Sequence, residues 1–224
     1  MSAVAAPAPS SRDDVPTPAA DPTPSAIRSR VLAATVRLIR EGSDRITIQD
    51  VVKESGVALQ TFYRSFNGKD DLLLAAIAGM IRSACDRFRS NAEGVDDPIE
   101  RLRCHIASVV GELHRADDGG ASARFIASER TRLAGVFPDL AQLADQPVID
   151  LFEAEIAAAN RTGQASSSDP ARDAFFITQL VMSVYRRSAF THVVGVSLAD
   201  DVFRFCLHGV VAASGAAPGA ANGD

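Results

Sequence analysis

The 224-residue sequence has no long apolar run and only three cysteines. A helix needs about 20 consecutive apolar residues to span a bilayer, so no membrane insertion is expected. The cysteines, Cys85, Cys104 and Cys206, are odd in number and widely separated, which gives neither a disulfide framework nor a metal-binding pattern. This cysteine usage is typical of a reducing compartment and predicts a cytoplasmic protein.

Sequence motifs for catalysis and cofactor binding are also missing. The chain has no glycine-rich phosphate loop, no nucleophile elbow and no His-Glu-x-x-His sequence. His105 and His114 fall on different faces of a helix with no recurring carboxylate, so solvated or core histidines are expected. Glu153 and Glu155 diverge around a helix and predict a solvated face, not an acid–base pair. We therefore expect no enzyme activity, no cofactor and no metal.

Strand patterns are absent as well, because no segment of any length alternates apolar and polar residues. Apolar residues recur instead at helical spacing between breaks rich in glycine and proline. The sequence predicts an all-α fold of about nine helices. They are expected at about residues 25–41, 48–55, 58–66, 69–90, 99–113, 121–133, 139–160, 171–194 and 198–213.

The most informative pattern lies in residues 47–69, which read as two short helices joined by a tight turn. Thr47 can cap the first helix together with Asp50. Gly56 stands where that helix must end in a left-handed backbone conformation. The arrangement predicts a helix-turn-helix, which presents one end of its second helix to the major groove of DNA.

The second helix of this motif has an apolar inner side and a polar outer side. Phe62 and Phe66, four residues apart, are predicted to anchor it inward. Amide, hydroxyl, phenol and cationic groups at its exposed end suit contacts to phosphates and base edges. The residues predicted to contact DNA are Thr47, Gln60, Thr61, Tyr63, Arg64 and Lys69.

The charge distribution agrees with this motif. Residues 25–90 contain 11 Lys/Arg and 7 Asp/Glu, a balance of +4, although the whole chain carries −5. Residues 91–224 contain 11 and 18, a balance of −7. A basic head on an acidic body concentrates the attraction for DNA at one end. Without the motif, an excess of this size would be ordinary surface variation.

The motif belongs to a longer pattern, made of Val31-Leu32-Ala33-Ala34, Leu38-Ile39, Glu41-Gly42, Thr47, Gly56-Val57, Thr61-Phe62-Tyr63, Phe66 and Lys69. With this pattern, residues 25–80 resemble the N-terminal domain of the TetR family of bacterial transcription regulators. Ala58, Leu59 and Ser65 depart from the family pattern, which leaves open the bases that are read.

The resemblance implies a ligand-responsive repressor that binds a near-palindromic double-stranded operator as a homodimer. A small hydrophobic effector would release it. The alternative is a helical ligand- or partner-binding protein that has lost DNA function, favoured only by the departures at Ala58 and Leu59. The expected organisation begins with a disordered tail at residues 1–24, which lacks the features of a signal peptide. A DNA-binding domain at 25–70, an effector-binding and dimerisation domain at 71–213 and a second disordered tail at 214–224 follow.

The last two predicted helices are apolar on nearly every side, so they must be buried on nearly every side. A deep monomer core and a seam between two copies both satisfy this, and the resemblance to a family that dimerises through its last two helices favours the seam. The predicted interface residues are Leu180, Val184, Val202, Phe205, Gly209 and Val210. Apolar residues that could line an effector pocket, or could be plain core, are Phe125, Phe152, Phe176, Met182 and Tyr185.

Overall fold

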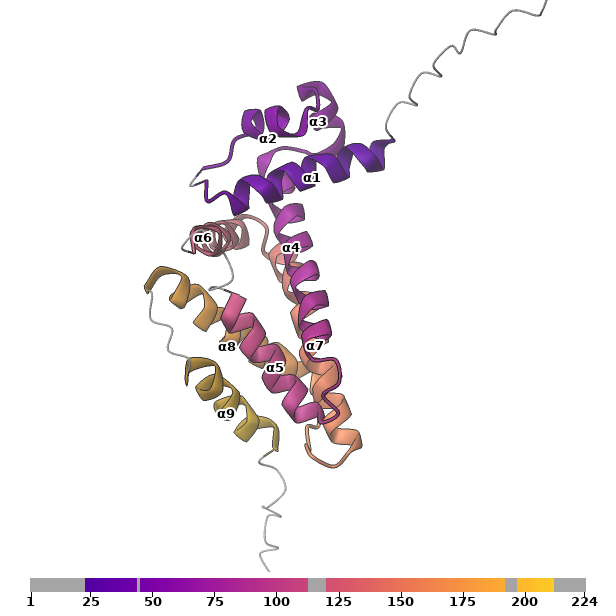
Figure 1. Ribbon diagram of the computed structural model, residues 1–224, viewed down its shortest axis with the longest axis vertical. Coiled ribbons are helices and arrows are strands. Elements are labelled where there is room, and N and C mark those ends of the chain that lie inside the picture. The colour runs from indigo at the N-terminus through magenta and orange to yellow at the C-terminus, as the bar shows by residue number, and fades with distance from the viewer. Residues whose placement is uncertain (1–22, 44, 113–119, 192–196, 212–224) are drawn as a thin grey trace, which may run out of the picture.

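The computed structural model describes residues 23–43, 45–112, 120–191 and 197–211, and its regular elements within these ranges are nine helices (Figure 1). The predicted all-α fold of about nine helices is confirmed. The helices are α1 (Pro24–Arg40), α2 (Ile48–Ser55), α3 (Leu59–Ser65), α4 (Lys69–Asn91), α5 (Pro98–Gly111), α6 (Ala121–Val136), α7 (Pro138–Arg161), α8 (Pro170–Thr191) and α9 (Ser197–Val211).

Helices α1, α2 and α3 form a head at one end of the molecule, and α4 runs from this head into the body (Figure 1). The core of the head contains Phe62 and Phe66, and it continues along α4 as far as Ile77. Phe125 and Leu133 of α6 belong to the same hydrophobic cluster. The head is therefore packed against the body beyond residue 70, where the sequence places the domain boundary.

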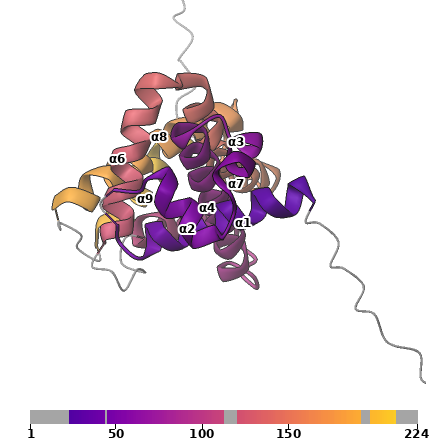
Figure 2. The same cartoon turned by 90° about the horizontal axis from the view of Figure 1, so that it is seen from above.

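Helices α5 and α7 pack on the lower part of α4, α8 packs on α7 and α5, and α9 packs on the outer side of α5 and α8; together they bury a second core, while α6 crosses below the head (Figures 1 and 2). Phe88 of α4 and Phe152 of α7 lie in this second core, at 3% and 0% exposure. Cys85 and Cys206 also lie there, and burial raises the pKa of each thiol to about 11. Both thiols are therefore protonated near neutral pH and act as small apolar side chains, as the sequence predicts.

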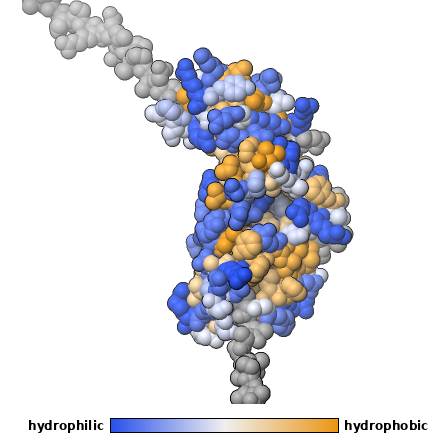
Figure 3. All heavy atoms as spheres, turned by 180° about the vertical axis from the view of Figure 1, so that it is seen from behind, coloured by the Kyte–Doolittle hydropathy of each residue, from blue (hydrophilic) through white to orange (hydrophobic). Residues whose placement is uncertain are grey.

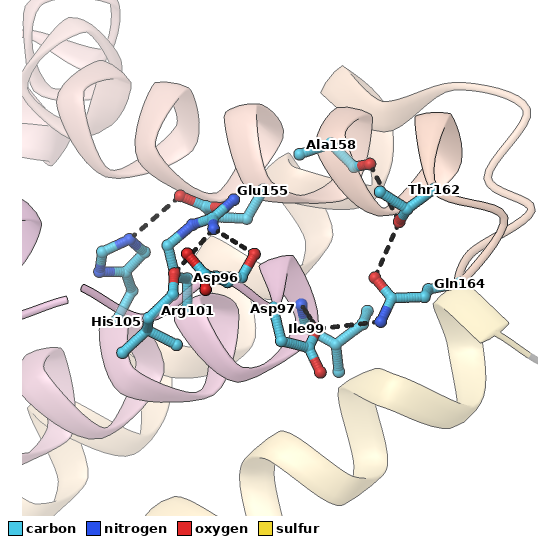
Figure 4. A network of polar contacts seen from close by, with 10 residues as sticks. Asp96, Asp97, Ile99, Arg101, His105, Glu155, Ala158, Thr162 and Gln164 are labelled. Carbon is cyan, nitrogen blue, oxygen red and sulfur yellow. Dashed lines mark hydrogen bonds and ion pairs between the residues drawn. The ribbon is translucent and has the colours of Figure 1, made fainter. Parts of the chain in front are cut away.

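A network of polar contacts joins α5 to α7 inside the body (Figure 4). Arg101 Nε donates to Glu155 Oε2 at 2.7 Å, and His105 Nε2 lies 3.4 Å from Glu155 Oε1. Nη1 of Arg101 donates to the backbone carbonyls of Val95 and Asp96. The prediction of a solvated face was wrong for Glu155, whose side chain is only 12% exposed. Sequence spacing gives the helix face but not the partner, and Arg101 is 54 residues away.

The substitution Glu155→Gln is expected to lower the free energy of unfolding by about 3 kcal/mol near pH 7, because it leaves the guanidinium of Arg101 without its counter-charge. Burial raises the pKa of Glu155, but hydrogen bonds from His105 and Arg101 outweigh it and hold the pKa below the ordinary 4.5. The ionised carboxylate thus stabilises the fold above that ordinary pKa, and its contribution is lost as the pH falls through the lower folded-state pKa.

Urea unfolding of the native and Glu155→Gln proteins over a pH series measures this difference. The gap between the two should narrow as the pH falls below 4.5. Glu153→Gln, two residues away and in no ion pair among the described residues, is the matched control and should change stability little at any pH. A Glu155→Gln protein as stable as the native one at pH 7 would contradict a stabilising role for the network.

Among the described residues, no helix combines the length and the apolar character that crossing a membrane requires.

Candidate functional site

The start of α2 is fixed by a reciprocal cap. The hydroxyl of Thr47 accepts the backbone N–H of Asp50 at 3.2 Å and donates to the Asp50 carboxylate at 2.6 Å. The same carboxylate accepts the backbone N–H of Thr47 at 2.9 Å, which confirms the predicted capping box. The hydrogen bonds from Thr47 hold the pKa of Asp50 below its ordinary value. The backbone N–H and the hydroxyl of Thr47 both donate to the Asp50 carboxylate. Thr47 therefore caps the helix and has no donor left for a phosphate in this conformation.

The turn between α2 and α3 has the geometry that its sequence predicts. Gly56 has φ 64° and ψ 23°, a left-handed conformation, and its N–H donates to the carbonyl of Val52 at 3.0 Å. A side chain at this position would strain the backbone. Val57 is buried at 6% exposure between the two helices. The turn thus sets the angle at which α3 leaves α2.

Helix α3 buries its aromatic residues and exposes its polar ones. Phe62 and Phe66 are 0% and 2% exposed, with ring centroids 5.6 Å apart. Tyr63 is 55% exposed and rests edge-on against Phe62, at 5.3 Å between centroids. Gln60 and Arg64 are exposed beside it. Thr61 is half-buried, so its hydroxyl lies at the margin of this outer face.

Three arginines of α1 hold the helix-turn-helix in place. Arg28 donates to the carbonyl of Ser65 at 2.6 Å, and its guanidinium lies 4.3 Å from the ring centroid of Phe66. Arg30 donates to the carbonyl of Ser55 at 2.9 Å. Both accepting carbonyls are at the C-terminal ends of short helices, where cations are stabilising. Arg37 forms an ion pair with Glu54 at 2.7 Å.

The sequence reveals these arginines as cations on the outer side of the first helix, but it does not identify their acceptors. Much of the positive excess of the head therefore has a structural use. The cations of the head that remain for contacts outside it include Arg64 of α3 and Lys69, which is the first residue of α4.

The N-terminus of α4 lies next to the end of α3. Gly68 precedes the helix with φ 134° and offers no side-chain cap. Lys69 is half-buried at the first position, where free backbone N–H groups favour anions. The carboxylate of Asp70 accepts hydrogen bonds from both terminal nitrogens of Arg132 in α6, at 2.6 and 3.2 Å. These hydrogen bonds hold the pKa of Asp70 below its ordinary value. This end of α4 is thus tied to α6.

Below the head lies a cavity of about 710 Å³, a size typical of small-molecule sites. Arg40, in the last turn of α1, also lines it, so the cavity reaches the head. A second cavity of about 410 Å³ shares four lining residues with the first, namely Ile77, Arg130, Met182 and Tyr185. The wall of the larger one is mainly apolar and is built by Ile77, Met80, Ile81, Ala84, Cys85, Phe88, Val109, Ala123, Ile126, Val148 and Met182.

Of the five residues predicted to line a pocket, Met182 and Tyr185 do so. Phe125 packs in the core of the head, and Phe152 is fully buried in the core of the body. Phe176 is 56% exposed on α8 and lines neither cavity. Aromatic residues at helical spacing do not reveal which helix face meets a cavity, so this distinction required the tertiary structure.

The predicted interface residues are spread over α8 and α9. Phe205 is 72% exposed and Gly209 is exposed, whereas Val202 is buried at 6% exposure. Leu180 and Val184 are half-buried. The side chain of Val210 lies outside the described part of the chain. Phe176 and Phe190 of α8 are also more than half exposed, and hydrophobic side chains gather over the body below a mainly hydrophilic head (Figure 3).

In the part of the chain that the structure describes, no group of three or more His, Cys, Asp and Glu side chains is arranged so that it could bind a metal ion. His105 is a core histidine at 1% exposure, whereas His114 is outside the described residues.

Comparison with known proteins identifies the head. Residues 31–76 match the family model described as bacterial regulatory proteins of the tetR family. An uncharacterized HTH-type transcriptional regulator of Bacillus subtilis (strain 168), YvdT, is 32% identical over 69 residues. That alignment covers 30% of this chain and 36% of the relative, so the match spans about a third of that protein.

Solved structures share the fold over about four fifths of the chain. RolR in complex with resorcinol superposes with a TM-score of 0.66, at 14% identity, over 84% of this chain and 88% of the other. The transcriptional regulator FadR from Bacillus subtilis in complex with stearoyl-CoA gives 0.60, at 16% identity, over 81% and 98%. The head therefore matches the tetR family of bacterial regulatory proteins, and the solved structures share the fold of the chain beyond the head as well. The resemblance predicted from the sequence is confirmed.

Proposed function

We propose that this protein is a ligand-responsive repressor that binds an operator as a homodimer and releases it when an effector occupies the cavity in its body. The observation that carries the proposal is the outer face of α3. Buried Phe62 and Phe66 fix that helix, while Gln60, Tyr63 and Arg64 remain exposed on it. A helix held in this way can enter a major groove with its polar side chains in fixed positions.

The groups at this face divide by chemistry. Gln60 is placed to read base edges, because its amide can donate and accept at one base, with Thr61 beside it. Tyr63, Arg64 and Lys69 would contact phosphates and fix the register of the helix on the duplex. Thr47 contributes indirectly, because its cap positions α2 against α3.

The dimer would form through α8 and α9. Exposed Phe176, Phe190 and Phe205 on these helices support a seam between two copies, since large apolar side chains grouped on a surface mark interfaces. A twofold dimer presents two copies of α3 and so favours a near-palindromic operator with half-sites at least one helical turn apart.

Effector binding would reach the head through α6, which lines the larger cavity with Ser122, Ile126 and Arg130. Ser122 Oγ donates to the carbonyl of Ile39 at the end of α1, at 2.9 Å. Farther along α6, Arg132 binds Asp70 at the start of α4. The solved structures with resorcinol and stearoyl-CoA support a small-molecule effector for a protein of this fold. A shift of α6 on binding would change the position of the head, with a coupling free energy of about 1–3 kcal/mol.

Gel-shift titration with the DNA upstream of its own gene tests the proposal. The native protein is expected to form one discrete complex that competitor DNA of unrelated sequence does not remove. Equal competition by unrelated DNA would refute specific operator binding. It would favour the alternative of a helical ligand- or partner-binding protein, for which Leu59 is the supporting observation, since it exposes 46% of an apolar side chain on α3.

A further inference from the structure

The charges around the larger cavity define the class of effector that it takes. We infer that the effector is an amphipathic carboxylic acid, whose carboxylate binds the cavity arginines Arg40 and Arg87 and whose apolar chain or ring fills the cavity. The inference rests on the proposed function for its regulatory meaning, but the binding site itself is argued from the cavity alone.

The charged residues that line the larger cavity, together with the ion-pair partner of one of them, leave one positive charge in excess. Among the lining residues that the structure describes, three are arginines, Arg40, Arg87 and Arg130, and one is a carboxylate, Glu112. Arg130 forms an ion pair with Asp145, which lines the second cavity. With Asp145 included, three cations face two anions. A monovalent anion such as a carboxylate completes the balance, whereas a doubly charged phosphate would exceed it.

The guanidinium of Arg87 has one N–H group, at Nε, that forms no hydrogen bond among the described residues. One terminal nitrogen of Arg87 binds Glu112 at 2.5 Å, and the other donates to the carbonyl of Ser83 at 3.2 Å. Its Nε is buried and has no hydrogen-bond partner among the described residues. A buried N–H without a partner is costly to the fold, and an acceptor atom of a ligand removes that cost. The carboxylate oxygen is the strongest acceptor for a guanidinium.

Arg40 is the cavity arginine without an ion pair within the part of the chain that the structure describes. It lies in the last turn of α1, next to Ile39, whose carbonyl is held by Ser122 of α6. Arg40 belongs to the head, whereas Arg87 belongs to the part of α4 that lies in the body. A carboxylate bound at Arg40 would therefore add a contact between the effector and the DNA-binding head itself.

The rest of the cavity accepts the apolar part of the ligand. Its walls are mainly aliphatic and aromatic side chains from α4 through α8, and the adjoining second cavity extends the space past Met182 and Tyr185. Burial of an apolar chain there supplies affinity, and the arginines supply the preference for an acid over its neutral analogue.

Isothermal titration calorimetry with matched probes tests the inference. Straight-chain carboxylates from hexanoate to hexadecanoate are compared with the primary alcohols of the same length. The native full-length protein is expected to bind its preferred carboxylate about 10-fold or more tightly than the matched alcohol, the scale of one hydrogen bond to a charged group. An equal affinity for acid and alcohol at every length, or no binding of either, would overturn the inference.

Variants then locate the carboxylate. Arg40→Ala and Arg87→Gln should each reduce the acid-to-alcohol preference while binding the alcohol as the native protein does, which shows that the cavity is intact. Arg82→Ala, an exposed arginine of α4 that lines neither cavity, should keep the full preference. If neither cavity variant changes the preference, the assignment of these arginines is wrong. Should Arg87→Gln fail to fold, Arg40→Ala decides the outcome, because its exposed side chain is not needed for packing.

The binding of DNA by the unliganded protein separates this inference from the proposed function. A protein that prefers carboxylates but binds no operator would refute the function and leave the ligand class standing. A protein that binds its operator but shows no preference for an acid would refute the ligand class alone.

Discussion

The Lys69→Ala protein is expected to bind all DNA sequences more weakly than the native protein, with its sequence preference unchanged. Lys69 is the first residue of α4, at a helix N-terminus that has no side-chain cap, beside the end of α3. A cation and free N–H groups at that point suit a phosphate, which every sequence presents. Loss of one phosphate contact should lower the slope of log K against log salt concentration by about 0.9.

Fluorescence anisotropy over a salt series measures this slope, and Lys69→Arg is the matched control because it keeps the cation.

Gln60→Ala should behave differently from Lys69→Ala. It removes the exposed α3 amide that we propose contacts a base edge, so it should cost about 1–3 kcal/mol at one base pair and relax the preference there. Selection of binding sites from random DNA distinguishes the two variants. If Lys69→Ala alters the preferred sequence and Gln60→Ala does not, the proposed orientation of α3 on the DNA, with Gln60 toward the bases and Lys69 toward the phosphates, is wrong.

Phe205→Glu should convert the proposed dimer into a monomer. The side chain of Phe205 is 72% exposed in the single chain, so the substitution has little reason to destabilise the monomer. At a seam formed by α8 and α9 it would bury an unpaired charge, which costs about 3–5 kcal/mol, or more than 100-fold in the dissociation constant. Operator affinity should fall with it, because one copy of α3 contacts only one half-site.

Analytical ultracentrifugation at micromolar concentration checks the oligomeric state, and thermal unfolding checks that the variant is folded. Leu143→Glu is the matched control. It introduces the same charge at a leucine that is 65% exposed on α7, which is not one of the two helices of the proposed seam, and should leave the proposed dimer intact. A native protein that sediments as a monomer, or a Phe205→Glu protein that remains a dimer, would rule out this interface.

Local rules of the sequence predicted the helix-turn-helix closely. The capping pair at Thr47 and Asp50, the left-handed turn at Gly56 and the buried pair Phe62 and Phe66 all depend on residues no more than four positions apart. Physical rules at such short range are read directly from spacing. The boundaries of the helices follow from the same rules, because glycine and proline mark most of their ends.

The site in the body depended on contacts between distant segments. Met182 and Tyr185 were predicted as pocket residues, but Phe176 turned out to point to solvent. The cavity arginines were missed, because sequence reasoning associated pockets with aromatic residues. Arg40 and Arg87 are ordinary surface-type residues on two amphipathic helices, and only the approach of α1, α4 and α6 brings them to one space. No sequence spacing encodes that approach.

The double attachment of α6 also affects how this protein can be recombined with another of the same fold. Phe125 and Leu133 complete the core of the head, and Ser122 and Arg132 bind the ends of α1 and α4. A chimera made by cutting the chain after the helix-turn-helix would keep the reading surface but would place α6 from one parent against a head from another. The smallest unit that can be transplanted with its own packing therefore includes residues from two separate stretches of sequence, the first three helices with the start of α4 and the inner face of α6.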